Sequence, residues 1–257
     1  MYALFFTVQG ITVGKNDMQY YIGLSILSTI YDAGAAQAIG GSRRGGMKRP
    51  RLRAESRRIL SLLEGRLLKE NDLAREKRGR PFFLSREVDC DFNIAHSGVL
   101  TAVSHVRGKN LHTGCDVERI RPRAGAGKIA DDFFSAQEKD YVFSQDGLNE
   151  TRFYEIWTLK ECYLKLRGLS VFDMAACPSF ISDEGEFAFG AALSLPLSFC
   201  LYELSGGMER YMLATVLEGL EQQPPELRWF SYLSFACKKT AEIKAAPNPA
   251  ETVSPKM

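Results

Sequence analysis

The chain has 257 residues, of which 45% are hydrophobic and 25% charged, and its net charge is +2 at pH 7. This length is sufficient for one large domain or two modest ones with a core of ordinary size. The composition is typical of a soluble globular protein and excludes a chain that is strongly basic or acidic throughout.

Cysteine usage indicates a reducing compartment. The chain has six cysteines, at Cys90, Cys115, Cys162, Cys177, Cys200 and Cys237. They form no CxxC pair and show none of the spacings of a zinc motif. No secretion signal accompanies them, so we expect reduced thiols in a cytoplasmic protein.

The N-terminal segment Met1–Val8 lacks a basic region and a small-residue cleavage site, so we expect a strand rather than a signal peptide. The apolar run Tyr20–Ile39 is interrupted by Asp32, Gln37 and several small residues. These interruptions favour an amphipathic core helix over a membrane span. Its apolar face would comprise Ile22, Ile26, Leu27 and Ile30.

A basic segment follows. Between Arg43 and Arg80 there are fourteen Lys/Arg against five Asp/Glu, a local balance of +9 that leaves −7 for the rest of the chain. We expect a flexible loop at Gly40–Gly46 and a helix over about Ala54–Lys69. Basic runs are often solvated faces or nucleic-acid contacts, but no interleaved aromatic residues or nucleic-acid motif accompany this one. The segment is a candidate anion-binding surface.

The next stretch predicts a cationic turn followed by two strands. Arg75–Pro81 is a short turn with four cations that a phosphate could satisfy. Phe92–Ala95 is predicted as a buried strand that ends at His96-Ser97-Gly98, and Leu100–Val106 is predicted to pair back with it. A lone histidine such as His96 is usually structural, so this pattern alone does not assign it a role.

The stretch Gly114–Glu118 predicts an acidic strand. The twofold period of a strand places Asp116 and Glu118 on one face, with Cys115 and Val117 on the other. The sequence therefore predicts two carboxylates side by side above an apolar face.

Beyond this strand, Arg119–Lys128 is rich in Arg, Pro and Gly and is predicted to be a loop. Ser135-Ala136-Gln137-Glu138 fits a capping box for a helix that runs to about Val142. A second helix is predicted over Glu150–Arg167, with Gly168 as its C-cap.

The C-terminal region predicts antiparallel strands and a disordered tail. The strands are separated by Gly- and Pro-bearing turns and are expected at Ser179–Ile181, Phe187–Phe189, Leu197–Leu204 and Tyr211–Val216. Lys238–Met257 has little to bury, so we expect disorder there.

The helix over Glu150–Arg167 carries the chemistry. Trp157, Glu161 and Lys165 share one side of it. Alone, the Glu161–Lys165 pair is an i,i+4 bridge worth a few tenths of a kcal/mol. If Glu161 meets the acidic strand, however, three carboxylates repel one another unless a hard cation lies between them. Mg²⁺ suits such oxygen ligands, and Lys165 can meet a phosphate, so we predict a metal-assisted reaction on a phosphate ester or anhydride.

These motifs resemble those of a known family. Gly114–Glu118, followed by Trp157–Glu161 and Lys165, resembles the paired signature of the 4'-phosphopantetheinyl transferases, in particular the larger, monomeric type that activates surfactin synthetase. The resemblance extends from about Arg53 to Leu169. It also includes Arg80-Pro81, Phe92–Gly98 and Phe133-Phe134-Ser135.

The resemblance implies an α+β fold. The sequence shows helix-then-strands twice, and the family adds a pseudo-twofold arrangement of two similar halves, each a helix packed on a small antiparallel sheet. We place the N-terminal half at residues 1–112 on the coenzyme's nucleotide side, and the C-terminal half, with metal and signature helix, at 113–236. Residues 237–257 form the tail.

The implied activity is transfer of the 4'-phosphopantetheine arm of coenzyme A to a serine of an apo acyl- or peptidyl-carrier protein, with release of 3',5'-ADP. The metal, Mg²⁺ or Mn²⁺, would be held by Asp116, Glu118 and Glu161. Catalytic roles fall to Glu161, Lys165 and His96. The resemblance places coenzyme contacts at Arg53, Arg58, Arg75, Arg80, Asn93, His96, Ser97, Asp116, Lys160, Glu161 and Lys165. We expect a monomer without nucleic-acid or membrane partners.

Departures and alternatives remain. Ala95 stands where the family usually has serine, and Cys115 where it usually has isoleucine. The same carboxylates also fit a Mg²⁺-dependent phosphohydrolase or nuclease, and a non-enzymatic binding module would need the acidic pair only as a structural ion site. The identity of the carrier protein stays open.

Overall fold

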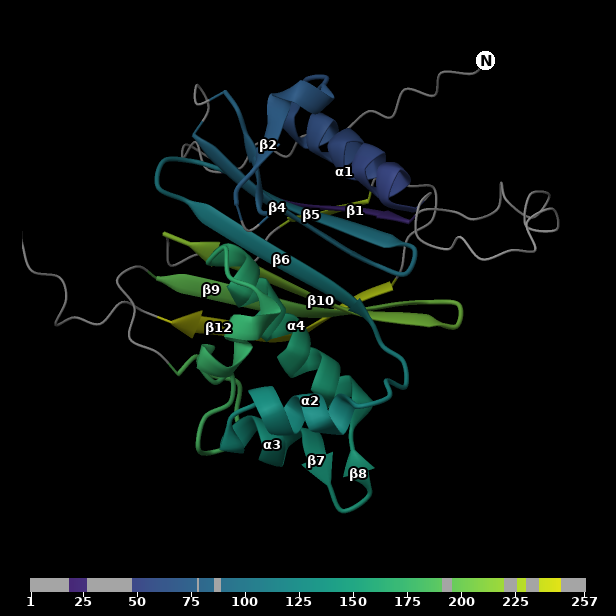
Figure 1. Cartoon of the computed structure of the whole chain (residues 1–257), viewed down its shortest axis with the longest axis vertical. Helices are drawn as coiled ribbons and strands as arrows, with labels where there is room; N and C mark the ends of the chain where they lie inside the picture. The colour runs from purple at the N-terminus through teal and green to yellow at the C-terminus, as the bar shows by residue number, and fades with distance from the viewer. Residues whose placement is uncertain are drawn as a thin grey trace, which may run out of the picture.

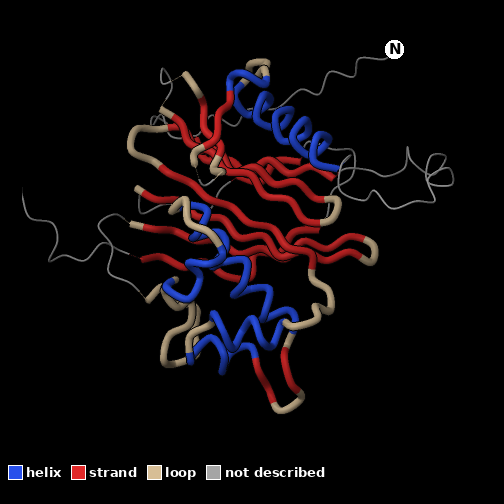
Figure 2. Tube along the Cα trace, viewed as in Figure 1, coloured by secondary structure: helices blue, strands red, loops and turns tan. Residues whose placement is uncertain are grey.

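The computed structural model describes residues 19–26, 48–77, 79–85, 89–190, 196–219, 226–229 and 236–245. They form a mixed α+β protein with two four-stranded sheets and two small hairpins (Figure 1). Figure 2 shows the strands of the two four-stranded sheets gathered in the middle of the molecule, with helices on both outer sides. None of the helices within these residues is long and apolar enough to cross a membrane.

The first sheet has the order β11-β1-β5-β4, in which β1 and β11 are parallel and the other pairs antiparallel. Its strands are β1 (Gln19–Ile26), β4 (Cys90–Ser97), β5 (Leu100–Arg107) and β11 (Glu226–Trp229). Helix α1 (Lys48–Glu64) covers its outer face by packing on β5 and β1. Because β5 is covered on both faces, its residues up to Val106 are buried without alternation.

The second sheet has the antiparallel order β12-β9-β10-β6. Its strands are β6 (His112–Arg119), β9 (Leu197–Gly206), β10 (Glu209–Glu218) and β12 (Ala236–Ala245). Helix α4 (Glu150–Leu166) packs on β6 and β10. The outer side of this sheet therefore carries the helix with the acidic and cationic residues.

Short elements complete the described chain. They are the 3-10 helices η2 (Glu70–Asp72) and η3 (Val171–Ala176), the hairpins β2–β3 (Leu73–Arg75, Pro81–Phe83) and β7–β8 (Phe143–Ser144, Gly147–Leu148), and the helices α2 (Ala126–Phe133) and α3 (Ala136–Val142).

The two sheets meet where β4 lies beside β6. Side chains rather than a backbone ladder connect these strands: Thr113 N donates to Asp91 Oδ2 at 2.8 Å, and Arg119 N donates to Ser97 Oγ at 3.0 Å. The strands run in the same direction, because the later residue of β4 bonds the later residue of β6. We call this contact the β4–β6 junction.

The alternation predicted for the acidic strand is confirmed. Cys115 and Val117 are buried in the core between the two sheets. Asp116 and Glu118 therefore project from the opposite face of β6, on which α4 packs.

The helix predicted over Tyr20–Ile39 is wrong for its first part, because Gln19–Ile26 is the strand β1. β1 pairs with β5 over its whole length, from Gln19 opposite Arg107 to Ile26 opposite Leu100. A short apolar run fits a buried strand as well as a helix, and here the neighbouring strand decides. Residues 27–39, the expected strand Met1–Val8 and the expected loop Gly40–Gly46 lie outside the described residues.

The disordered tail predicted from Lys238 is also wrong in part. Residues up to Ala245 belong to β12, which pairs with β9 and buries Ile243 to 3% exposure. The strand is an exposed edge whose backbone partners come from a distant segment, so its composition did not reveal it. Residues 246–257 are outside the described part of the chain.

Other elements begin or end at different residues than predicted. α1 begins at Lys48, ahead of the predicted Ala54, and ends at Glu64, where Gly65 takes φ 68°. The predicted loop ends earlier, since α2 starts at Ala126. The strands expected around residues 180 and 188 reduce to a single bridge, Ile181 to Phe187.

Several predictions are confirmed. Ser135 caps α3 with the reciprocal bonds of a capping box, in which Glu138 N donates to Ser135 Oγ and Ser135 N donates to Glu138 Oε2. The signature helix spans Glu150–Leu166, and Gly168 follows it at φ 62°. The strands predicted before and after the β4–β5 turn, and at β6, β9 and β10, all form.

Candidate active site

Helix α4 presents the chemical groups of the site. Asn149 caps it by accepting from Arg152 N at 3.1 Å, and most of the helix is buried because β6 and β10 cover one side and α3 and η3 contact it. Trp157 stacks on Phe153 of the same helix, with ring centroids 6.0 Å apart, and both rings are buried. One turn further on, Glu161 and Lys165 face the carboxylates of β6.

Asp116 is the centre of the site. It is 4% exposed, and its Oδ1 accepts from Lys165 Nζ at 2.6 Å. Its second oxygen, Oδ2, is buried without a hydrogen-bond partner among the described residues. A buried carboxylate oxygen without a donor is costly, so this atom is a candidate ligand for a group that the chain does not supply.

Glu118 is held by Ser97. Ser97 Oγ donates to Glu118 Oε2 at 2.9 Å and accepts from Arg119 N at 3.0 Å. The backbone of β6 thus orients the hydroxyl, and the hydroxyl orients the carboxylate. Ser97 was predicted to contact the coenzyme, whereas the structure gives it a positioning contact with a predicted metal ligand.

Like charges perturb the titration of the site. Burial, followed by the negative charge of Asp116, raises the pKa of Glu161 to about 7, although Lys165 acts against this shift. The pKa of Glu118 is raised for the same two reasons. Burial alone would lower the pKa of Lys165, but the charge and hydrogen bond of Asp116, together with Cys115 and Glu161, outweigh burial and raise that pKa. These carboxylates carry more negative charge than their neighbours neutralise.

The pKa of His96 is lowered. Partial desolvation is the main cause, and the nearby charges of Lys165 and Arg75 add to it. His96 is the second-to-last residue of β4, is exposed, and lines the pocket. It is therefore a neutral ring at pH 7 in this arrangement, next to cations that an anionic ligand would meet.

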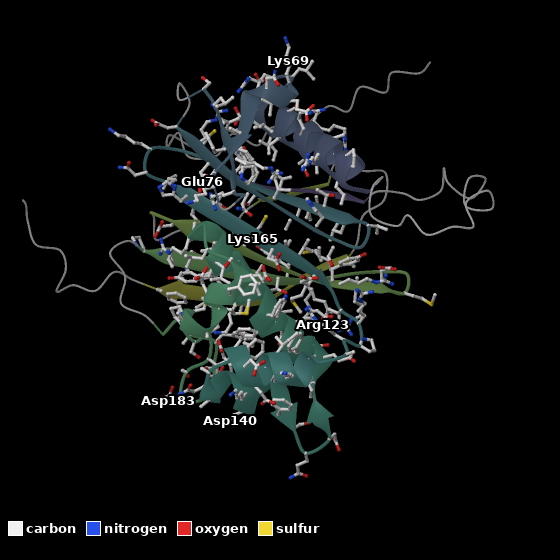
Figure 3. All side chains as sticks on the ribbon, in the orientation of Figure 1. Lys69, Glu76, Arg123, Asp140, Lys165 and Asp183 are labelled. Atoms are coloured by element: carbon white, nitrogen blue, oxygen red, sulfur yellow. The ribbon has the colours of Figure 1, made fainter. Side chains whose placement is uncertain are left out.

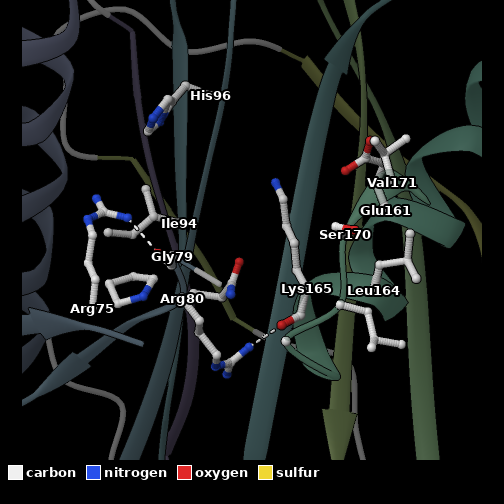
Figure 4. Close-up of a pocket in the computed structure, with 14 residues that line it drawn as sticks. Arg75, Gly79, Arg80, Ile94, His96, Glu161, Leu164, Lys165, Ser170 and Val171 are labelled. Carbon is white, nitrogen blue, oxygen red and sulfur yellow. Dashed lines mark hydrogen bonds between the residues drawn. The ribbon is translucent and has the colours of Figure 1, made fainter. Parts of the chain in front are cut away.

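A pocket of about 290 Å³ opens beside these groups. Figure 4 shows Arg75 and His96 on one side of it, with Glu161 and Lys165 of α4 on the other. Its lining includes six predicted site residues, which are Arg75, Arg80, Asn93, His96, Glu161 and Lys165. In Figure 3 the labelled Lys165 lies near the middle of the molecule, between α1 and the α2–α3 region.

Arg80 lines the pocket, but its guanidinium is bonded within the protein. It donates to Asp91 Oδ2 at 2.6 Å, to Thr113 O at 2.9 Å and to the carbonyl oxygen of Lys165. Arg75 is more available, because it is exposed and its guanidinium donates to the nearby Gly79 O, at 2.7 Å.

Other predicted coenzyme ligands lie elsewhere. Arg53 and Arg58 are on α1 and do not line the pocket, and Arg58 bonds Glu55 at 2.7 Å. Lys160 is 1% exposed, with Nζ 3.0 Å from Glu138 and directed to the carbonyl groups after η3. Its ammonium group is enclosed there, so in this structure it stabilises the helix packing and does not reach the pocket.

Sequence reasoning missed Arg123 and the apolar wall of the pocket. The Arg123 guanidinium lies 4.9 Å from the centroid of the Trp157 ring, and its positive charge acts on Glu118 and Glu161. Leu169 and Val171, just beyond α4, line the pocket although both are 37% exposed. The sequence signal for Arg123 was a basic loop directly after an acidic strand. Nothing in that loop indicated which of its arginines would fold back onto Trp157.

The donor set fits a hard divalent cation. Asp116, Glu118 and Glu161 offer only oxygen ligands, and Asp116 Oδ2 has no hydrogen-bond partner among the described residues. The charge of Asp116 raises the pKa of both Glu118 and Glu161. Their oxygens do not form a group within 4.8 Å of one another in the described structure, and Lys165 neutralises Asp116 instead. The fit therefore rests on the chemistry and charge of the oxygen donors, and the three carboxylates must move closer together to bind one ion.

Comparison with known proteins identifies the segment around this site. Residues 112–216 match the family model of the 4'-phosphopantetheinyl transferase superfamily. The 4'-phosphopantetheinyl transferase psf-1 of Bacillus pumilus is 34% identical over 109 residues, which are 41% of this chain and 42% of that protein. The transferase gsp of Aneurinibacillus migulanus is 36% identical over 109 residues, 40% and 41% of the two chains.

A shorter relative is matched over a larger share of its length. The 4'-phosphopantetheinyl transferase AcpT of Escherichia coli K12 is 31% identical over 127 residues, 48% of this chain and 63% of that protein. The chain spans about half the length of the curated relatives it matches. Residues 112–216, which hold Asp116, Glu118, Glu161 and Lys165, are thus the part of the chain that is similar to the 4'-phosphopantetheinyl transferase superfamily.

Proposed function

We propose that the chain transfers the 4'-phosphopantetheine arm of coenzyme A to a serine of an acyl- or peptidyl-carrier protein and releases 3',5'-ADP. The observation that carries this proposal is the pocket flanked by Arg75, His96 and Lys165, with Glu161 in its wall and Asp116 bonded to Lys165. Cations meet a pyrophosphate there beside a carboxylate that can accept a proton.

The proposed binding roles follow from position. Lys165 and His96 contact the pyrophosphate, Arg75 meets a phosphate at the pocket mouth, and the apolar wall formed by Leu169 and Val171 covers non-polar parts of the coenzyme. Asp116, Glu118 and Glu161 would hold Mg²⁺, or Mn²⁺, whose charge would neutralise the leaving phosphate. Arg53 and Arg58 would take part only if residues outside the described structure bring the coenzyme's nucleotide toward α1.

The chemical step is a substitution at the phosphorus of the pantetheine phosphate. The carrier serine Oγ forms the new bond to phosphorus, and the bond to the bridging oxygen of the pyrophosphate breaks, so 3',5'-ADP leaves. Glu161 accepts the serine proton, and Lys165 stabilises or protonates the departing phosphate oxygen. Holding the two reactants side by side supplies much of the remaining acceleration.

We also propose the finer architecture of the family for this chain. One half would comprise β1, β4, β5 and α1, and the other β6, β9, β10 and α4, related by a pseudo-twofold axis with the boundary near residues 112–113. Strand β11 (Glu226–Trp229) crosses back from the second half to the sheet of the first. The α1-plus-sheet and α4-plus-sheet layers support this division, and the site at the β4–β6 junction lies where the halves meet. A monomer in a reducing, cytoplasmic compartment is proposed with it, supported by six free cysteines.

The test is an incubation with coenzyme A, Mg²⁺ and an apo carrier protein, read by the mass of the carrier. The expected result is a gain equal to one phosphopantetheine arm, dependent on Mg²⁺ and on the carrier serine. A carrier with that serine replaced by alanine is the control. Phosphate or nucleotide release without any carrier, at the same rate, would identify a phosphohydrolase instead, and no turnover of either kind would leave a binding module.

A further inference from the structure

A second cluster of ligand-type side chains lies away from the pocket, beneath the end of α1. Glu64 is the last residue of α1, Cys90 opens β4, and His105 lies on β5. Their ligand atoms all lie within 4.8 Å of one another, the one such group of three or more His, Cys, Asp or Glu side chains in the described residues. None of the three lines the pocket.

The cluster is enclosed. The side chains of His105 and Glu64 are 0% and 1% exposed, and His105 Nε2 is hydrogen-bonded to Glu64 Oε1. His105 Nδ1 is buried without a hydrogen-bond partner in the described structure. Cys90 is half-buried, so one side of the group stays open toward solvent.

Without a cation, the Cys90 thiol and the Glu64 carboxylate are an unfavourable pair. Burial, followed by the charge of Glu64, raises the pKa of Cys90 to about 12, so the sulfur keeps its proton beside a carboxylate. A metal ion would reverse this by binding the thiolate directly. Thiolate, imidazole and carboxylate together select a borderline-soft ion with tetrahedral coordination over Mg²⁺.

Two arginines form ion pairs with the carboxylate of Glu64 in this structure. Arg107 Nη2 lies 3.1 Å and Arg66 Nε 3.9 Å from Glu64 Oε2. Their side chains are 35% and 44% exposed, so both can turn into solvent when a divalent ion takes their place. The arginines therefore hold the carboxylate in position but do not close the site.

We propose that Glu64, Cys90 and His105 form a Zn²⁺ site with a solvent molecule in the fourth position, which ties the end of α1 to β4 and β5. On binding, the Cys90 thiol releases its proton to solvent, and the His105–Glu64 hydrogen bond is replaced by one bond from each residue to the metal. The imidazole stays neutral, with its proton on the nitrogen that does not bind. The site is distinct from the oxygen-only set around Asp116.

Cobalt(II) tests this site in the whole protein, because only a thiolate ligand produces a thiolate-to-cobalt charge-transfer band in the near ultraviolet. The metal-free protein is given Co²⁺ while excess Mg²⁺ occupies the oxygen ligands of the other site. We expect the band in the parent, its absence in Cys90→Ser, and its retention in Cys237→Ser, which removes an exposed cysteine on β12.

Binding of Zn²⁺ is the second measurement on the same proteins. Zn²⁺ should bleach the cobalt band and raise the Tm of the parent by about 5 to 10 °C at about a hundredfold excess over Kd, with no rise in Cys90→Ser. A parent without the band, a band that persists in Cys90→Ser, or an equal Tm rise in both proteins would overturn the proposal.

An alkylation experiment on the unmodified chain avoids dependence on the folding of a variant. Iodoacetamide labelling of Cys90, read by peptide mass, should slow at least tenfold when Zn²⁺ is present, whereas labelling of Cys237 should not change. Equal labelling of Cys90 with and without Zn²⁺ would show a hydrogen-bonded structural cluster and overturn the metal site.

Discussion

The two ends of the β4–β6 junction hold two polar clusters of opposite character. At one end, Asp91 accepts from Arg80 at 2.6 Å and from Thr113 N at 2.8 Å, and these contacts, with that of His112, lower its pKa although burial alone would raise it. At the other end, Asp116 keeps an orphan oxygen, and the pKa of Glu161 is raised to about 7.

The difference separates structural from functional polar groups. A buried carboxylate whose acceptors are filled by the chain has a completed network and stabilises the fold. Carboxylates that raise one another's pKa store unfavourable charge, which a cation or a proton from a substrate can relieve. Mutations at the first cluster should therefore act on stability, and mutations at the second on activity.

Arg80→Ala tests the structural end and should have the largest effect on folding. Arg80 and Asp91 are 11% and 18% exposed, so losing the cation leaves a mostly buried carboxylate without its countercharge and removes the guanidinium's bonds to two carbonyl groups. We expect the free energy of unfolding to fall by about 3 kcal/mol. Urea denaturation measures this.

Arg210→Ala is its matched control. Arg210 pairs with Glu203 but is 47% exposed, so its loss should cost under about 1 kcal/mol. If Arg80→Ala instead kept parental stability and only raised the KM for coenzyme A, its guanidinium would be a ligand group and the comparison would fail.

Glu161→Gln tests the functional end. The substitution preserves shape but removes the proposed base and a proposed metal ligand, so carrier modification should fall by at least about 10². Stability without Mg²⁺ should hold or rise, because one of the repelling charges is gone. Turnover is measured at saturating Mg²⁺.

Glu155→Gln on the same helix is the control for Glu161→Gln. Glu155 bonds Tyr141 at 2.7 Å, away from the pocket, so this variant should keep near-parental turnover. Near-parental turnover in Glu161→Gln as well would contradict the assignment of the base.

Ser97→Ala removes the hydroxyl that orients Glu118. A hydrogen bond to a charged group contributes about 1.5 kcal/mol or more, so we expect about a tenfold loss of activity. The Mg²⁺ concentration for half-maximal rate should rise with it, a change that a structural defect alone would not produce. Ser97→Thr keeps the hydroxyl and should restore most of both values; an unaltered Mg²⁺ requirement in Ser97→Ala would refute the positioning role.

Glu118→Gln probes the repulsion itself. The amide can still accept from Ser97 while relieving the charge of Asp116, so stability without Mg²⁺ should rise by about 0.5 to 1 kcal/mol. The added stability conferred by Mg²⁺ on the parent should shrink in the same variant. A clear loss of stability in metal-free buffer would mean that Glu118 is satisfied as an anion.

The smallest expected effect is a pH dependence at the structural end. The lowered pKa of Asp91 means that its contribution to stability is present above about pH 4 and is lost as the pH falls through its folded value. Contact with Asp91 raises the pKa of His112, so the histidine's contribution is present below about pH 6.5 and is lost as the pH rises through its folded value.

The stability difference between the parent and Asp91→Asn should therefore be greatest between about pH 4.5 and 6.5 and smaller on both sides. Denaturant unfolding over a pH series measures it. A difference that stays constant from about pH 3 to 8 would show that neither charge contributes.

Local patterns in the sequence were sufficient for the groups that carry the chemistry. The alternation of Gly114–Glu118 predicted which side of β6 would be acidic, and the helical period predicted that Glu161 and Lys165 share a face. Both are properties of a single element, since side-chain direction follows from backbone period. The capping box at Ser135 was equally local.

What only the tertiary structure decided was the partner of each group. The strand β1 and the edge strand β12 form because distant strands supply their hydrogen bonds, so neither was visible in its own composition. The same holds for the bonded guanidinium of Arg80, the enclosed Lys160 and the turn of Arg123 onto Trp157. It holds most clearly for Glu64, Cys90 and His105, whose spacing matches no zinc motif because the fold of α1 onto β4 and β5, rather than their order in the chain, brings them together.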